Sequence, residues 1–151
     1  MLKKKFKSIF ILIFAIIITE NSFSIEPNIF VQSTVNRASQ ILSEDTSKNE
    51  KIDKLKVIAK ETVDIRGIGF YTLGKYRKTL NDVQKDKYSE LFYEYFLKSF
   101  SSRLSEYSNP KIDVQSQEKL NENYTIVSSI LFATETRPEV KIQWRIYPKN
   151  P

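Results

Sequence analysis

Residues 81–107, NDVQKDKYSELFYEYFLKSFSSRLSEY, are the stretch that decides the fold of this chain. The large apolar residues in it recur at steps of three and four, the spacing that places side chains on one face of an α-helix. They are Tyr88, Leu91, Phe92, Tyr95, Phe96, Phe100, Leu104 and Tyr107. Asn81 or Asp82 can cap the first turn, and Pro110 cannot continue the helix. The pattern predicts one long helix whose apolar face needs a partner.

Two interpretations of this apolar face stay open. An apolar helical stripe usually packs on a sheet as part of an ordinary core. The same face could instead form one wall of a cavity for an apolar ligand. Periodicity alone does not separate the two interpretations.

The composition limits the chemistry of the chain. Its 151 residues are 40% hydrophobic, which is enough for one domain with its own core. The absence of cysteine excludes disulfides and thiolate metal sites. The absence of histidine removes the most frequent general base and metal ligand, so catalysis would have to rest on carboxylates, lysine or tyrosine. We predict no catalytic residue, no metal and no cofactor.

Residues 1–24 have the pattern of a targeting segment. A positive leader contains Lys3, Lys4, Lys5 and Lys7. An apolar run follows at residues 9–18, and Ser22 and Ser24 are small residues of the kind that signal peptidase requires. Ten apolar residues are too few to span a bilayer core of about 30 Å, although a membrane anchor remains the alternative. We predict a cleaved signal peptide over 1–24 and a domain over 25–151 that works outside the cytoplasm.

Removal of the leader lowers the net charge. The leader carries four lysines and Glu20, so 20 basic and 17 acidic residues remain, with a net charge of +3 in place of +6. The remaining lysines are interleaved with acidic residues rather than clustered. This pattern argues against nucleic-acid binding and leaves a weak attraction to anionic membrane surfaces.

Two further amphipathic helices are predicted before the long one. Residues 28–45 place apolar side chains on one face, with Asn28 as a possible cap. Residues 50–63 repeat the pattern, with lysines on the opposite face. Both are most simply scaffold helices.

All three glycines of the chain lie in residues 64–80, DIRGIGFYTLGKYRKTL. Closely spaced glycines break or bend helices, so we predict short helical turns here. The side chains expected to face inward are Ile68, Phe70, Leu73 and Tyr76. Gly67 and Gly69 do not make a nucleotide-binding loop, because no strand is predicted before them and the rest of that motif is missing.

After Pro110 the apolar period changes from helical to alternating. Strands are predicted to begin at Ile112 and to cover residues 124–132 and 138–147. The third alternates most clearly, with Val140, Ile142, Trp144 and Ile146 on one face. A short turn separates the last two strands, so we expect them to pair as a hairpin.

Two segments together resemble the MlaC family, the toluene-tolerance type of periplasmic phospholipid-binding component. Residues 63–80 contain the leucine-glycine and aromatic-arginine pairs of that family as Leu73-Gly74 and Tyr76-Arg77. The long helix then repeats aromatic residues every four positions. The likeness continues through the third strand and covers essentially the whole mature chain.

The resemblance implies an α+β fold in which helices pack on one face of a curved antiparallel sheet around a cone-shaped apolar cavity. The acyl chains of a phospholipid would lie between the long helix and the sheet. Each methylene buried contributes about 0.8 kcal/mol, so two long acyl chains cannot cross an aqueous space without a carrier. The implied partners are an outer-membrane donor complex and an inner-membrane ABC transporter complex, between which lipid passes to maintain outer-membrane asymmetry.

The resemblance also implies which residues line the cavity. They are Leu73, Phe92, Phe96 and Phe100 from the helices and Val127, Leu131, Ile142 and Trp144 from the sheet. The resemblance to the family implies that Val127 and Leu131 point inward. The residues of this strand alone would equally support the opposite face. Arg77 and Arg145 could pair with a phosphate, but we favour solvated or salt-bridged arginines.

Members of this family normally continue after the third strand with another strand and helical segments, so we expect a C-terminally shortened domain. Two other classes of protein stay open. A secreted interaction module without ligand would use the apolar patch left by the missing strand. A small cone-shaped enzyme of the ketosteroid-isomerase kind would need a carboxylate in the cavity, and the predicted inward positions contain none.

Overall fold

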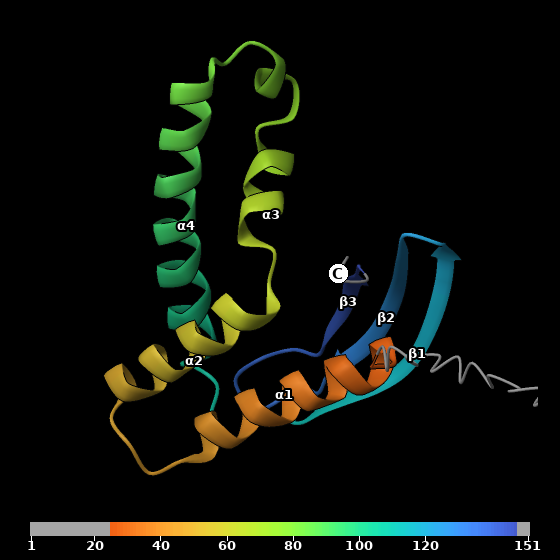
Figure 1. The fold of residues 1–151 in the computed structure, drawn as a ribbon. Helices are drawn as coiled ribbons and strands as arrows, with labels where there is room; N and C mark the ends of the chain where they lie inside the picture. The colour runs from red at the N-terminus through yellow and green to blue at the C-terminus, as the bar shows by residue number, and fades with distance from the viewer. Residues whose placement is uncertain (1–24, 148–151) are drawn as a thin grey trace, which may run out of the picture.

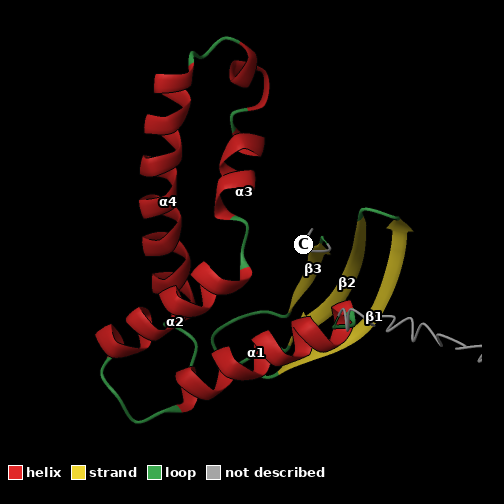
Figure 2. Cartoon of the chain, in the orientation of Figure 1, coloured by secondary structure: helices red, strands yellow, loops and turns green. Residues whose placement is uncertain are grey.

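A computed structural model describes residues 25–147 (Figure 1), so the predicted signal peptide at 1–24 lies outside the described residues. The elements in chain order are α1 (Pro27–Ser43), α2 (Lys48–Thr62), α3 (Ile65–Thr72), the short 3-10 helix η1 (Gly74–Lys78), α4 (Asp82–Leu104), β1 (Ile112–Asn121), β2 (Tyr124–Leu131) and β3 (Val140–Ile146). Figure 2 distinguishes the helices from the strands, which all follow the helices in the sequence. The predicted α+β fold class is confirmed: four helices pack with a three-stranded antiparallel sheet.

The sheet has the order β1-β2-β3 with both neighbouring pairs antiparallel, so the predicted hairpin of the last two strands is confirmed. Val127 lies in the centre of the sheet, opposite Gln117 of β1 and Trp144 of β3. Val127 and Leu131 are both buried, whereas Ile126, which precedes Val127 on β2 and points to the other face, is only half-buried. The inward orientation expected for Val127 and Leu131 is therefore confirmed.

The first apolar core lies between α1 and the sheet. Its buried members are Val31, Val35 and Val127, and the half-buried side chains packed on them are Phe30, Ile112, Val114, Trp144 and Ile146. In Figure 1, α1 runs along one face of the curved sheet. The proposed cap at Asn28 is wrong, because the helix begins one residue earlier at Pro27, whose fixed φ suits the first turn.

The second apolar core lies between the remaining helices. Its buried members are Ala59, Ile65 and Leu97, joined by the half-buried Val63, Phe92, Tyr93, Phe96 and Phe100. Helix α4 starts at a capping box of Asn81 and Gln84, which confirms the predicted start. Its main packing partners are α2 and α3, so the expectation that the long helix lies over the sheet is wrong. The reason is that α1 already covers the apolar face of the sheet.

The segment between α2 and α4 forms a hairpin with α4, as Figure 1 shows. Helix α3 and the turn η1 confirm the predicted short helical turns. Phe70 and Leu73 are half-buried, as expected, but Ile68 and Tyr76 are exposed, so their predicted inward direction is wrong. Tyr76 lies in η1, at the end of the hairpin, where the main neighbour of η1 is α3 itself.

Gly69 lets α3 approach α4 closely. A Cβ atom at this position would lie 2.8 Å from Cδ1 of Phe92, which is inside normal contact distance. We expect Gly69→Val to lower the free energy of unfolding by about 1–3 kcal/mol, because the phenyl ring must leave its place in the second core. Urea denaturation followed by circular dichroism measures the loss.

Ile68→Val is the matched control for this prediction. Ile68 precedes Gly69 on the same helix and is exposed, so the change should stay within about 0.5 kcal/mol. Equal losses in the two variants would contradict the close packing of α3 on α4 at Gly69.

Candidate functional site

The structure places five of the eight predicted lining residues in the two cores and three outside them. Phe92, Phe96 and Phe100 belong to the helical core. Val127 and Trp144 belong to the core between α1 and the sheet. Leu131 is buried, and Leu73 and Ile142 are half-buried. The helical and sheet sets therefore do not form one shared cluster.

The helical set forms part of a continuous aromatic row along α4. Ring centroids of Tyr88 and Phe92 are 5.9 Å apart, those of Phe92 and Phe96 are 6.2 Å apart, and those of Phe96 and Phe100 are 5.3 Å apart. The four residues follow one another at intervals of four, which keeps them on one side of the helix. All four are half-buried, so each ring is packed on one side and retains exposed surface.

The buried face of α4 differs from the predicted stripe. Leu91 and Tyr95 were expected on the apolar face but are 58% and 67% exposed. Leu97 and Ser101, which were not in the stripe, are buried. The prediction followed the spacing of the large side chains. The residues that are buried are instead those on the side of α4 that contacts α2 and α3.

A hydrogen bond fixes the indole of Trp144 on the sheet. Its Nε1 donates to Oγ of Ser129 over 2.8 Å, and Ser129 itself is buried on β2. Ser129 lies between Val127 and Leu131 on the same face of the strand. Sequence reasoning missed Ser129, although the alternation of β2 places it on the buried face.

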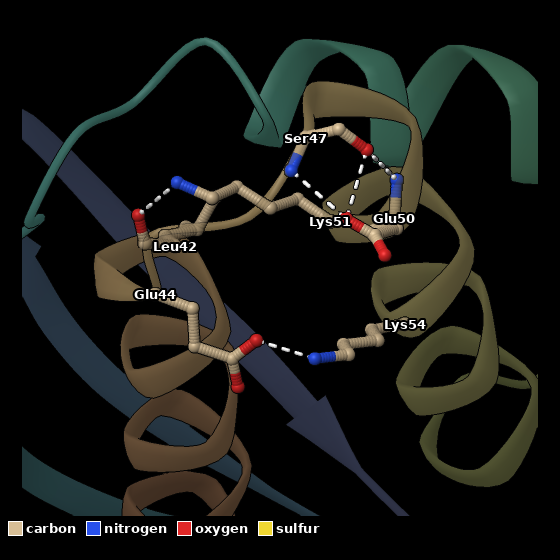
Figure 3. A network of polar contacts seen from close by, with 6 residues as sticks. All are labelled: Leu42, Glu44, Ser47, Glu50, Lys51 and Lys54. Atoms are coloured by element: carbon tan, nitrogen blue, oxygen red, sulfur yellow. Dashed lines mark hydrogen bonds and ion pairs between the residues drawn. The ribbon is translucent and has the colours of Figure 1, made fainter.

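A polar network joins the two cores where α1 meets α2 (Figure 3). Nζ of Lys51 donates to the carbonyl oxygen of Leu42 over 3.0 Å, so α2 binds the end of α1. Lys54 forms an ion pair with Glu44 in the same connection. These contacts set the direction in which α2, and with it the hairpin of α3 and α4, leaves α1.

Ser47 and Glu50 start α2 within this network (Figure 3). The backbone N–H of Ser47 donates to the carboxylate of Glu50 over 3.0 Å, and the backbone N–H of Glu50 donates to Oγ of Ser47. The backbone and side-chain hydrogen bonds from Ser47 lower the pKa of Glu50. This capping box fixes the start of α2 directly after Ser47, beside the end of α1.

A second connection holds the β2–β3 loop on the end of α4. Nη2 of Arg137 lies 2.8 Å from Oε2 of Glu106, and its guanidinium lies 4.5 Å from the ring centroid of Tyr107. The hydrogen bond from Arg137 lowers the pKa of Glu106, and the same bond raises the pKa of Arg137. The sheet and the helical core are thus joined at both ends of the helical segment.

Polar side chains line two shallow hollows of the described residues. One lies on the exposed side of α1 around Gln32 and Asn36, and the other lies beside Arg137. Neither contains a predicted lining residue, so the apolar cavity stays a prediction. Within residues 25–147, no cluster of acidic side chains suits a metal ion, and no helix is long and apolar enough to cross a membrane.

Arg77 and Arg145 do not meet in the structure. Arg77 lies in η1, and Arg145 lies on β3 with its guanidinium 5.6 Å from the ring centroid of Tyr124. Both side chains are exposed, which agrees with the favoured interpretation of solvated arginines.

The described residues define a small α+β protein whose candidate site is a set of apolar side chains rather than a constellation of polar groups. The family model for the MlaC protein matches residues 32–151, and the chain belongs to the MlaC family. Membership in this family agrees with the expectation from the sequence that the protein is not an enzyme.

One curated relative is the intermembrane phospholipid transport system binding protein MlaC of Haemophilus influenzae. It is 24% identical over 128 residues, which cover 81% of this chain and 60% of that protein. The chain thus spans about 60% of the length of this relative, which is less than two thirds.

Proposed function

We propose that this protein is a periplasmic phospholipid-binding carrier, the component of an intermembrane transport system that moves single lipids between two membranes. Membership in the MlaC family supports this function, as does the relative named as an intermembrane phospholipid transport system binding protein. The proposed partners are an outer-membrane donor complex and an inner-membrane ABC transporter complex. The predicted signal peptide would deliver the chain to the compartment between them.

The row of half-buried phenylalanines on α4 is the observation that carries the proposal. Phe92, Phe96 and Phe100 pack against the buried core around Leu97, and each remains only half-buried. An acyl chain laid along the row would remove their exposed surface from water, at about 25 cal/mol per Å² of apolar area. No polar partner is needed along such a path, which suits a saturated hydrocarbon.

The sheet would supply the second group of contacts. Ile142 and Trp144 are half-buried on β3, and the hydrogen bond to Ser129 holds the indole in one orientation. The buried Val127 and Leu131 would support these side chains from β2. Together with Leu73, these residues remain the proposed lipid contacts. Because burial of the acyl chains supplies the binding free energy, release requires a membrane or partner that offers an equally apolar environment.

Lipid extraction from purified protein tests this function. We expect the processed protein, recovered from the periplasm, to carry phospholipid that mass spectrometry identifies. Phe96→Ser removes one ring of the row and should weaken lipid retention about tenfold, since a phenylalanine contact contributes about 1.5 kcal/mol or more.

Tyr95→Ser is the matched control, because Tyr95 is the neighbouring aromatic residue and points to solvent. It should leave lipid retention unchanged. Thermal unfolding of both variants shows whether the fold is kept. Protein that repeatedly contains no lipid, in variants and wild type alike, would overturn the carrier function.

A further inference from the structure

The turn at the end of the α3–α4 hairpin exposes large side chains that other elements do not cover. Tyr71 at the end of α3 is 78% exposed, Tyr76 in η1 is 61% exposed, and Val83 in the first turn of α4 is 78% exposed. In Figure 1 this turn is the part of the hairpin farthest from α1 and α2. A protruding end with exposed apolar side chains is suited to contact with another surface.

The same turn carries a local excess of positive charge. Residues 65–81 contain Arg66, Lys75, Arg77 and Lys78 and no acidic residue. This excess contrasts with the interleaved charges of the rest of the mature chain.

The acidic residues nearest to the turn are already paired. Asp82 lies 3.4 Å from Nζ of Lys85, and Asp86 lies 3.5 Å from Nη2 of Arg66. Lys75, Arg77 and Lys78 have no acidic partner within ion-pair distance among the described residues. Their charge is therefore available to an external anion.

We propose that this turn docks the protein on the surface of a bilayer that contains anionic phospholipids. The basic tip, as we call it, consists of Tyr71, Lys75, Tyr76, Arg77, Lys78 and Val83. Lysine and arginine attract anionic headgroups, while tyrosine favours the boundary between headgroups and acyl chains. This combination fits a membrane surface better than an acidic protein, because a purely electrostatic partner gives no reason to expose Tyr71 and Val83.

The backbone holds these side chains in one compact turn. Gly74 has φ of +52°, a left-handed conformation that a residue with a Cβ atom rarely adopts. The chain turns there from α3 into η1, and Nζ of Lys75 lies 5.4 Å from the ring centroid of Tyr76. Cation and ring are thus presented together at the end of the hairpin.

The proposal goes beyond lipid carriage, since surface docking does not require a lipid in the apolar site. Each basic residue close to an anionic membrane surface strengthens binding about fivefold, so three of them contribute about 100-fold. The attraction falls off within a Debye length of about 10 Å at 0.1 M salt. Docking through the tip should therefore be sensitive to salt.

Sedimentation with vesicles tests the proposal on processed protein whose N-terminal residue has been determined. One set of vesicles contains phosphatidylglycerol with phosphatidylcholine, and the other contains phosphatidylcholine alone. We expect binding to the first set, and about 100-fold weaker binding for the variant with Lys75→Gln, Arg77→Gln and Lys78→Gln. Tyr71→Ser combined with Tyr76→Ser should keep the charge and reduce the binding that persists at high salt.

The matched control changes Lys60, Lys111 and Lys141 to glutamine. These three lysines are exposed and lie away from the turn, so the net charge falls by the same amount while the tip is intact. Binding of this control close to wild type would support the tip as the docking site. Equal losses in both triple variants would overturn the proposal in favour of general charge attraction. Wild-type protein that binds neither vesicle set would also overturn the proposal, and an acidic protein would then be the binding partner to test at the tip.

Discussion

Val127→Asp is expected to unfold the protein at room temperature. Val127 is 0% exposed in the centre of the sheet and packs against Val31 and Val35 of α1. An ionised carboxylate at this position would lose its water without gaining a cation, at a cost of several kcal/mol. That cost is comparable with the whole stability of a small domain, about 5–15 kcal/mol. Loss of the far-ultraviolet circular dichroism signal and of a cooperative urea transition would show the unfolding.

Ser128→Asp provides the control at the neighbouring position. Ser128 points to the opposite face of β2, where its partners across the sheet are Ser116 and Gln143. The new carboxylate keeps access to water there, and we expect a loss below about 1 kcal/mol. A folded and stable Val127→Asp variant would mean that α1 does not cover this face of the sheet.

The alternation of β3 predicted its inner face, whereas the inner face of β2, with Val127 and Leu131, followed only from the family resemblance. Neither showed what covers the sheet. An apolar face shows only that water is excluded from it. The faces of α1 and α4 are both apolar and both long enough to cover three strands. In the structure Val31 and Val35 of α1 pack on the sheet, and α4 packs on the other helices. The choice depends on the path of the chain between the elements, which periodicity does not describe.

That path depends on polar contacts at the connections between elements. The ion pair of Arg137 with Glu106 joins residues that a strand hairpin and a loop separate. The contact of Lys51 with the carbonyl oxygen of Leu42 depends on how α1 ends. Neither pair has a sequence signature, because each residue type is common on exposed helices and loops. The division of the candidate site between two cores could not be predicted for this reason.

The end of the hairpin shows a different limit of the sequence analysis. Tyr76 was expected to face inward because aromatic residues are usually part of a core. It lies instead in the exposed turn η1, beside three basic residues. The charge of the turn was visible in the sequence, since residues 65–81 lack any acid. Taken with the neighbouring cations, an exposed tyrosine is the expected outcome at a surface that meets a membrane.

Leu97→Ala is expected to lower the free energy of unfolding by about 2–5 kcal/mol. Leu97 is 4% exposed and packs with Ala59 and Ile65 at the centre of the helical core. Removal of its branched end leaves a cavity that the phenylalanines of the row cannot fill without changing their positions. Urea denaturation measures the loss, and lipid extraction from the same variant shows whether the row still holds a ligand.

Leu91→Ala deletes the same atoms from the same helix and is the control that decides how α4 is oriented. Leu91 and Leu97 lie about 120° apart around the helix axis, because each residue advances the helix by about 100°. Leu91 is 58% exposed, so its change should stay within about 0.5 kcal/mol. The apolar stripe predicted from the sequence contained Leu91 and omitted Leu97. It would therefore predict a larger loss of stability for Leu91→Ala than for Leu97→Ala. A larger loss of stability for Leu91→Ala would mean that a different face of α4 is buried. Phe92, Phe96 and Phe100 would then not lie along the proposed lipid path.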